Sequence, residues 1–244
     1  MSIVFAPRER PGEYRRHSRA IGYTPGDLVI ERSIATGTHG RYLVVPPASA
    51  GPAPIIMGFH GYAEGAEPQL ERLRAIPGAE RWRLVSVQGL NRFYQRRTNE
   101  VVAGWMTRQD RELAIADNLA YVAGVMDAVD GEWPGAPRVV LAGFSQGVAM
   151  MFRAAAAAAT PVDGVMAVGG DVPPELDRAA LARVRAALVC RGARDEWYTS
   201  ATFDNDVRRL RDAGTDVRPL LFEAGHEWSA DVVRAASLFL HELP

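Results

Sequence analysis

The residues best suited to chemistry in this chain begin with a serine in the pentapeptide Gly-Phe-Ser-Gln-Gly at 143–147. Ser145 follows the apolar run Val139–Ala142, which predicts a strand, and precedes Val148–Ala159, which predicts a helix. A serine on a sharp strand-to-helix turn exposes its hydroxyl beside helix amides that stabilise negative charge. A tight turn that only needs two glycines would give the same pentapeptide, but the flanking strand and helix favour Ser145 as the nucleophile of an acyl transfer.

The second requirement is a base, because a serine hydroxyl is a poor nucleophile without one within hydrogen-bond reach. Of the five histidines, His60 and His226 come soon after predicted strands, Ile55–Phe59 and Val217–Phe222. In a parallel sheet such positions lie at the edge where ligands bind. His60 precedes Gly61, where the backbone is the more useful group, so His226 is expected to be the base.

The third requirement is an acid that fixes the histidine tautomer and stabilises the imidazolium. Asp195 follows the predicted strand Ala187–Cys190 and lies between the serine and the histidine, which is the chain order of nucleophile-elbow enzymes. A loop aspartate that caps the next helix is the alternative interpretation. Asp171, at the end of the strand Gly164–Val168, is the runner-up for the acid, and Glu196 is a further rival.

The negative oxygen of a tetrahedral intermediate needs two hydrogen-bond donors. We expect one to be the backbone N–H of Gln146, directly after the nucleophile. The other is expected from the loop 60–65, where Gly61 lets the amides turn inward and the N–H of Tyr62 is the candidate. The Tyr62 ring would then cover the site.

The elements that must position these residues alternate between strands and helices from Ile55 onward. The further predicted elements are the strand Leu84–Val87 and the helices Glu67–Ala75, Arg111–Val129, Pro174–Arg183, Thr199–Ala213 and Ser229–Leu240, the last with Ser229 as N-cap. This alternation predicts an α/β fold with a mostly parallel central sheet and helices on both faces.

The N-terminal part differs in composition from the rest of the chain. Residues 1–26 are polar, rich in arginine and broken by prolines, and are expected to form an arm. Residues 27–244 are expected to form a single domain. The segments Leu28–Ala35 and Arg41–Val45 flank a turn-rich pentapeptide and predict an antiparallel hairpin at its start.

Composition excludes several other kinds of protein. The net charge of −1 gives no argument for a nucleic-acid partner, and no apolar run is long enough to span a bilayer. All 28 basic residues are arginine, so no lysine can act as a Schiff base. The single cysteine, Cys190, rules out an internal disulfide, and no metal-ligand motif occurs. The N-terminus has no secretory pattern, so the cytoplasm is the expected location.

Four short motifs in order carry a family resemblance: Phe-His-Gly-Tyr at 59–62, Gly-Phe-Ser-Gln-Gly at 143–147, Arg-Gly-Ala-Arg-Asp at 191–195 and Ala-Gly-His-Glu at 224–227. From about residue 40 to the C-terminus, the chain resembles the phospholipase/carboxylesterase branch of the α/β-hydrolases, which includes acyl-protein-thioesterase-like esterases. The resemblance implies an α/β-hydrolase fold, no metal and no organic cofactor. It also implies Ser145, Asp195 and His226 as the triad, with Tyr62 and Gln146 as oxyanion donors.

The chain departs from the family pattern at pocket positions, which leaves the substrate open. Tyr62 stands where leucine is common, Trp-Met-Thr at 105–107 replaces Trp-Phe-Asp, and Glu-Trp-Tyr-Thr at 196–199 replaces a Val-Val-Pro continuation. The segment Asn91–Asp110 is expected to border the site. The apolar wall is assigned to Trp105, Met106, Trp197, Tyr198 and Trp228, although each could equally be packed in the core. Arg92, Arg96, Arg97 and Arg108 could bind an anionic substrate group or form a solvated face.

The leading hypothesis is a serine hydrolase that cleaves carboxylic esters or thioesters of small or medium acyl chains through an acyl-enzyme. A peptidase or amidase on the same triad is the second interpretation. A non-catalytic binding module on this scaffold is the third, because a fold does not guarantee activity. A homodimer formed through the early hairpin or the arm is compatible with the sequence, but no feature selects it.

Overall fold

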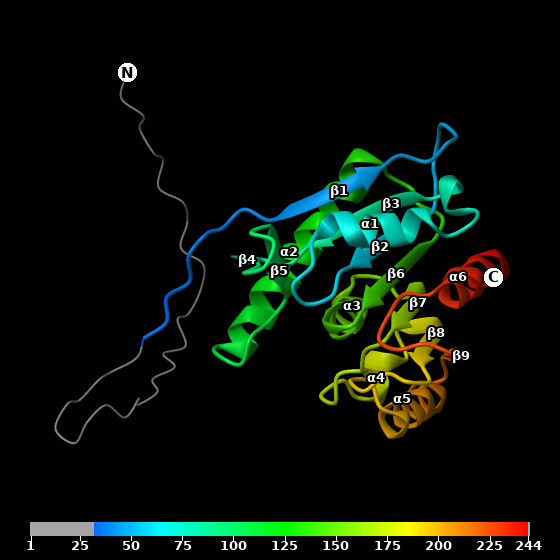
Figure 1. Cartoon of the computed structure of the whole chain (residues 1–244). Helices are drawn as coiled ribbons and strands as arrows, with labels where there is room; N and C mark the ends of the chain where they lie inside the picture. The colour runs from blue at the N-terminus through cyan, green and yellow to red at the C-terminus, as the bar shows by residue number, and fades with distance from the viewer. Residues whose placement is uncertain (1–31, 244) are drawn as a thin grey trace. The chain divides into compact units, whose positions relative to one another are not determined.

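The computed structural model describes residues 32–243, and the chain divides into two compact units, Met1–Thr38 and His39–Pro244. In the first unit the described residues, 32–38, form neither helix nor strand. The predicted arm at 1–26 lies outside the described residues. The second unit contains the sheet, the helices and the candidate site (Figure 1).

The centre of the second unit is a seven-stranded sheet with the order β1-β3-β2-β6-β7-β8-β9. These strands are β1 (Arg41–Val45), β2 (Ile55–Phe59), β3 (Arg83–Gln88), β6 (Val139–Phe144), β7 (Val162–Val168), β8 (Val184–Gly192) and β9 (Asp216–Phe222). Only β1 runs antiparallel to its neighbour, β3, and the remaining pairs are parallel. The mostly parallel α/β sheet predicted from the sequence is therefore confirmed.

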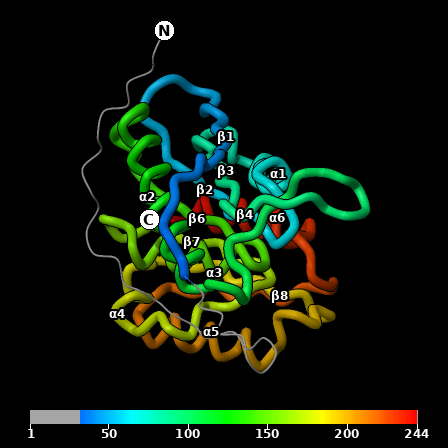
Figure 2. The backbone as a smooth tube through the Cα atoms, turned by 90° about the vertical axis from the view of Figure 1, so that its left-hand side faces the viewer, coloured from blue at the N-terminus to red at the C-terminus, as the bar shows by residue number. Residues whose placement is uncertain are grey.

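Helices cover both faces of this sheet, as predicted. They are α1 (Ala66–Arg74), α2 (Arg111–Glu132), α3 (Gln146–Ala157), the short α4 (Arg178–Leu181), α5 (Ser200–Asp212) and α6 (Ala230–Glu242), with a 3₁₀ turn at Ala79–Arg81. Alternate residues of β2 belong to the two faces: Met57 is part of the core cluster that includes residues of α2, α3 and α5, and Ile56 is part of the cluster that includes residues of α1 and α6. Figure 2 shows α2 on one side of the strands and α1 and α6 on the other.

The predicted N-terminal hairpin requires correction. Of Leu28–Ala35, residues 32–35 carry no strand, and residues 28–31 lie outside the described part. Arg41–Val45 pairs with β3 instead. Tyr42 and Val44 pack against one core cluster, and Leu43 and Val45 pack against the other. A strand with apolar contacts on both faces belongs at the edge of a covered sheet, not in a solvated hairpin.

Two further segments differ from expectation. The segment Asn91–Asp110 contains a two-stranded antiparallel sheet of β4 (Asn91–Tyr94) and β5 (Val101–Gly104), where no regular element was predicted. The helix predicted at Pro174–Arg183 is confined to α4, because Asp177 caps it by accepting a hydrogen bond from the Ala180 amide.

The order of the strands explains where a site can form. From β2 the chain first enters β3 on one side and later returns to β6 on the other side. The carboxyl ends of β2 and β6 therefore lie at a topological switch point, where open α/β sheets bind ligands. His60 follows β2 and Ser145 follows β6, so both lie at this edge.

Candidate active site

Ser145 occupies a strained turn between β6 and α3. Its backbone has φ of 52° and ψ of −122°, a region that non-glycine residues seldom adopt, and α3 begins at the next residue. A Cβ on Gly147 would lie 2.2 Å from the carbonyl oxygen of Phe59, and one on Gly143 would lie 2.7 Å from the Cα of Val148. The two glycines of the pentapeptide are thus required because the backbone passes this close on both sides of the serine.

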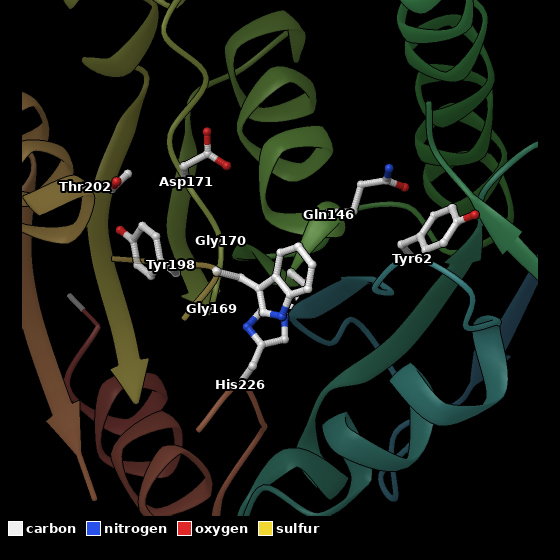
Figure 3. Close-up of a pocket in the computed structure, with 10 residues that line it drawn as sticks. Tyr62, Gln146, Gly169, Gly170, Asp171, Tyr198, Thr202 and His226 are labelled. Carbon is white, nitrogen blue, oxygen red and sulfur yellow. Dashed lines mark hydrogen bonds between the residues drawn. The ribbon is translucent and has the colours of Figure 1, made fainter. Parts of the chain in front are cut away.

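The three side chains singled out in the sequence form one hydrogen-bonded chain. His226 Nε2 lies 2.8 Å from Ser145 Oγ, and His226 Nδ1 lies 2.8 Å from Asp195 Oδ2. Asp195 follows β8, and its side chain is 1% exposed, whereas the His226 side chain, after β9, is 23% exposed. Figure 3 shows His226 between Tyr62 and Gln146 on one side and Tyr198 on the other. This arrangement can pass a proton from the serine hydroxyl to the imidazole.

Backbone groups fix the orientation of Asp195. Its Oδ1 accepts the amide N–H of Trp197 at 2.9 Å and of Tyr198 at 3.0 Å, which leaves Oδ2 for the histidine. The buried Arg191, at the end of β8, donates to the carbonyl oxygens of Tyr198 and Asp195. Sequence reasoning missed Arg191, although its place at the strand end was a signal.

The rival acids lie elsewhere. Glu196 is exposed, and Asp171 is exposed at the edge of the cavity. Neither makes a hydrogen bond or ion pair with His226 among the described residues. Between Asp171 and the sheet, Gly169 has φ of 64°, and a Cβ there would lie 3.1 Å from His226 Cε1. A glycine therefore leaves room for the imidazole next to Asp195.

The loop that carries Tyr62 is held on both sides of that residue. The Gly61 amide donates to Glu64 Oε2 at 2.9 Å, and the Ala63 amide donates to the carbonyl oxygen of Ala103 in β5 at 3.0 Å. Arg72 in α1 binds both oxygens of Glu64 at 2.6 Å. Burial alone would raise the pKa of Glu64, but this ion pair and the Gly61 amide lower it on balance. Glu64 and Arg72 were not predicted as site residues.

His60 stabilises the same loop and is not placed as a base. It is fully buried, and the Gly89 amide donates to its Nε2 at 2.9 Å. Its Nδ1 must then carry the proton, which it donates to the carbonyl oxygen of Gly61 at 2.7 Å. Burial lowers the pKa of His60, which agrees with this neutral form.

The side chain of Gln146 has a structural contact that the sequence did not reveal. Its Oε1 accepts the Trp105 amide at 2.8 Å, and its Nε2 donates to the Met106 carbonyl at 3.0 Å. Trp105 itself is fully buried, and its indole donates to the carbonyl oxygen of His60. As the first residue of α3, Gln146 keeps its own backbone N–H without an intrahelical partner. Among the described residues that amide has no other acceptor, so it remains available as a donor.

A cavity of about 520 Å³ opens onto Ser145 and His226. Of the residues predicted for substrate contact, Trp197 and Tyr198 line it. Tyr62, predicted as an oxyanion donor, also lines it and is exposed. The structure places Trp105 and Met106 in the core and packs Trp228 against the α6 side of the sheet, so these three do not line the cavity. Thr202 and Gly170 also line it and were not predicted.

None of the ten lining residues is an arginine. Arg92 instead donates to the carbonyl oxygen of His39, and Arg96, Arg97 and Arg108 are exposed. Asp171 is the acidic side chain of the lining. The cavity therefore offers aromatic and hydroxyl groups to a substrate, and the arginine-rich segment does not serve it.

The described residues contain no cluster of three or more His, Cys, Asp or Glu arranged to hold a metal ion. Within the same residues, no helix has the length and apolar character needed to cross a membrane.

The sheet order, the covered faces and the serine turn define an α/β-hydrolase fold. A Phospholipase/Carboxylesterase family model matches residues 102–243, more than half of the chain. The protein belongs to this family. No curated protein matches it in sequence.

Solved structures share the fold at low sequence identity. The Bacillus cereus carboxylesterase superposes with a TM-score of 0.69 at 15% identity over 84% of this chain and 95% of its own. Esterase PE8 gives 0.67 at 19% identity over 85% and 100%. Zea mays acyl-protein thioesterase 2 gives 0.65 at 16% identity over 83% and 98%. At sequence identities this low, the comparison shows that the fold is shared and does not show a shared activity.

Proposed function

We propose that this protein is a serine hydrolase that cleaves carboxylic esters, with thioesters as related substrates, through an acyl-enzyme intermediate. The observation that carries the proposal is the continuous hydrogen-bonded chain from Ser145 Oγ through His226 to Asp195. Membership of the Phospholipase/Carboxylesterase family supports it.

The mechanism follows from this geometry. His226 Nε2 takes the hydroxyl proton as Ser145 Oγ attacks the ester carbonyl, and the imidazolium is stabilised by Asp195 Oδ2. The backbone amides of Gln146 and Tyr62 are the proposed donors to the resulting oxyanion. The tetrahedral intermediate collapses when His226 returns the proton to the leaving alkoxide or thiolate. A water molecule then repeats these steps on the acyl-enzyme and releases the acid.

The cavity supports small or medium acyl groups. Its volume of about 520 Å³ lies in the lower half of the range of roughly 300–1,000 Å³ for ligand pockets. Trp197 is 84% exposed beside it, and the buried Tyr198 forms part of its wall. We propose Trp197, Tyr198 and Tyr62 as the substrate-contacting side chains.

The test is Ser145→Ala assayed with p-nitrophenyl esters of increasing acyl length. The kcat is expected to fall by roughly 10⁴–10⁶ with folding unchanged, because the variant loses the nucleophile. Ser237→Ala is the matched control, since Ser237 lies on α6 and bonds the Pro77 carbonyl. A fluorophosphonate probe is expected to label the wild type and the control but not Ser145→Ala. A loss below tenfold, or labelling of another residue, would contradict the proposal.

The same three side chains would serve an amidase, so parallel assays with aminoacyl p-nitroanilides distinguish the two activities. Failure of every activated ester to give a burst of p-nitrophenol would favour a non-catalytic binding module instead.

A further inference from the structure

A second cavity, of about 560 Å³, lies at the opposite edge of the sheet from Ser145. Three chain segments line it: the β1–β2 loop 46–52, the first residue of β3, Arg83, and the turn after α2 at Trp133 and Pro134. We refer to it as the proline-rich cavity, because Pro46, Pro47, Pro52 and Pro134 all belong to its lining. The mechanism proposed above does not use any of these residues.

The unusual group in the proline-rich cavity is the guanidinium of Arg83. Arg83 is only 4% exposed, and its Nε is buried without a hydrogen-bond partner. The described residues give the Arg83 side chain no hydrogen bond or ion pair, and its cation–π contact is with the ring of Trp133, whose centroid lies 4.6 Å from Cζ. A buried guanidinium normally has several partners, because loss of hydration without replacement is costly. The Nε of Arg83 is therefore a donor that an acceptor on a ligand would satisfy.

The charges around Arg83 limit what that acceptor can be. The carboxylate of Glu132 is exposed and acts on Arg83 through space, but forms no ion pair with it. Burial lowers the pKa of Arg83, and Glu132 opposes this effect. With one guanidinium and a carboxylate nearby, the cavity suits a monoanion better than a dianion such as phosphate.

The other lining residues indicate which shape and polarity the rest of the ligand should have. The Trp133 ring is a flat apolar surface beside the guanidinium, and the prolines have few conformations to lose on binding. Two backbone bonds hold the walls in place: the Ala48 amide donates to Glu80 O at 2.8 Å, and the Arg83 amide donates to Pro54 O at 2.8 Å. These bonds hold the Ala48 and Arg83 parts of the wall.

We propose that the proline-rich cavity binds a monocarboxylate carried on a planar apolar body. The carboxylate accepts two hydrogen bonds from Arg83, as the fork of a guanidinium allows, and the planar body packs on Trp133. The cavity opens at the amino ends of the parallel strands, and β2 alone separates the two edges by about 16 Å for its five residues. The ligand would therefore occupy a site separate from the ester-cleaving one.

The experiment is a titration of the ¹⁵N-labelled full chain with sodium benzoate, followed by the indole N–H signals in ¹H–¹⁵N spectra. Trp133 reports the proline-rich cavity and Trp197 reports the cavity at Ser145. The variants Trp133→Phe and Trp197→Phe assign the two signals. We expect the Trp133 signal to shift saturably with benzoate, and benzamide, the neutral isostere, to bind at least about tenfold more weakly.

The matched variants are Arg83→Met and Arg81→Met. Arg81 is exposed two residues away and does not line the cavity. Arg83→Met is expected to weaken benzoate binding about tenfold or more, and Arg81→Met to leave it unchanged. If Arg83→Met fails to fold, Trp133→Leu, which keeps the charge and removes the flat surface, is expected to weaken binding several-fold, measured by calorimetry.

Three results would overturn the proposal. One is a benzoate-dependent shift of the Trp197 signal without one of Trp133. Another is equal affinity for benzoate and benzamide at the Trp133 signal. The third is unchanged benzoate affinity in Arg83→Met, or in Trp133→Leu where that variant replaces it. None of these measurements requires ester hydrolysis, so the proposal stands or fails independently of the proposed function.

Discussion

Replacement of Asp195 by asparagine should reverse the proton arrangement at His226 without changing the shape of the site. In the wild type, Asp195 Oδ1 accepts the amides of Trp197 and Tyr198, and Oδ2 faces His226 Nδ1. An asparagine keeps its oxygen toward the two amides, so its NH₂ group faces Nδ1. Nδ1 must then accept, the ring proton moves to Nε2, and Nε2 no longer accepts the proton of Ser145.

The size of the effect follows from the same contacts. Turning the amide over to restore the productive tautomer would leave two backbone N–H groups facing an NH₂ group, at about 1–3 kcal/mol for each lost hydrogen bond. The imidazolium also loses its negative partner. A barrier increase of about 4–5.5 kcal/mol corresponds to a fall in kcat of about 10³–10⁴. Because Asp195 does not line the cavity, KM should change less than about threefold.

The assay is steady-state hydrolysis of p-nitrophenyl butyrate by wild type, Asp195→Asn and Asp171→Asn, with thermal unfolding as the check on folding. Asp171→Asn is the matched control, since it removes the charge of the rival acid at the cavity edge. We expect it to keep kcat within about fivefold. If Asp195→Asn retains more than a tenth of the wild-type kcat, or if Asp171→Asn is the more damaged variant, the assignment of the acid is refuted.

Three other predictions concern the groups around the site. Glu64→Gln should lower kcat about tenfold with little change in KM, because it weakens the contacts that hold the loop 60–65, which carries the proposed oxyanion donor Tyr62. Gly147→Ala should lower the free energy of unfolding in urea by more than about 3 kcal/mol, because its Cβ would lie 2.2 Å from a carbonyl oxygen. The wild type should lose stability as the pH falls below about 6.5, by up to about 1.4 kcal/mol per pH unit, because the folded state lowers the pKa of His60 and the unfolded chain then binds the extra proton. His60→Gln should reduce that loss in urea titrations between pH 7 and 5.

Each of these predictions has a control. Glu67→Gln breaks the exposed pair with Arg41 and should leave kcat within twofold. Gly124→Ala lies in α2 with open space around its Cβ and should stabilise the protein by up to about 1 kcal/mol. His241→Gln, on the exposed end of α6, should keep the wild-type pH dependence. Equal effects in a variant and its control would contradict the corresponding argument.

The sequence was informative where a local pattern fixes the backbone. The apolar run before Gly143 and the helix-favouring residues after Gly147 define the serine turn. The chain order of strands and helices predicts the parallel sheet. Ser229 also caps α6 as predicted, by accepting the Val232 amide. These features depend on residues close together in the chain, so a reading along the sequence can find them.

The residues whose positions were predicted wrongly are placed by contacts between segments far apart in the chain. Trp105 follows β5 in a segment with several aromatics, which suggested a substrate wall. Its indole instead meets the His60 carbonyl, 45 residues away, and it is fully buried. The strand Arg41–Val45 likewise pairs with β3, where it satisfies the backbone groups on the side of β3 away from β2. Burial and pairing of this kind are set by the whole fold.

The sequence by itself determined the sheet, its covered faces, the turn at Ser145 and the candidates Asp195 and His226, since each follows from local periodicity, turn chemistry or chain order. Only the tertiary structure decided how Glu64 and Arg72 hold the loop 60–65, that Asp195 rather than Asp171 faces His226, and that Arg83 is buried with its Nε unpaired among the described residues. The physical reason is that hydrogen bonds and burial depend on distance in space. Residues far apart in the chain come close together only when the whole chain folds.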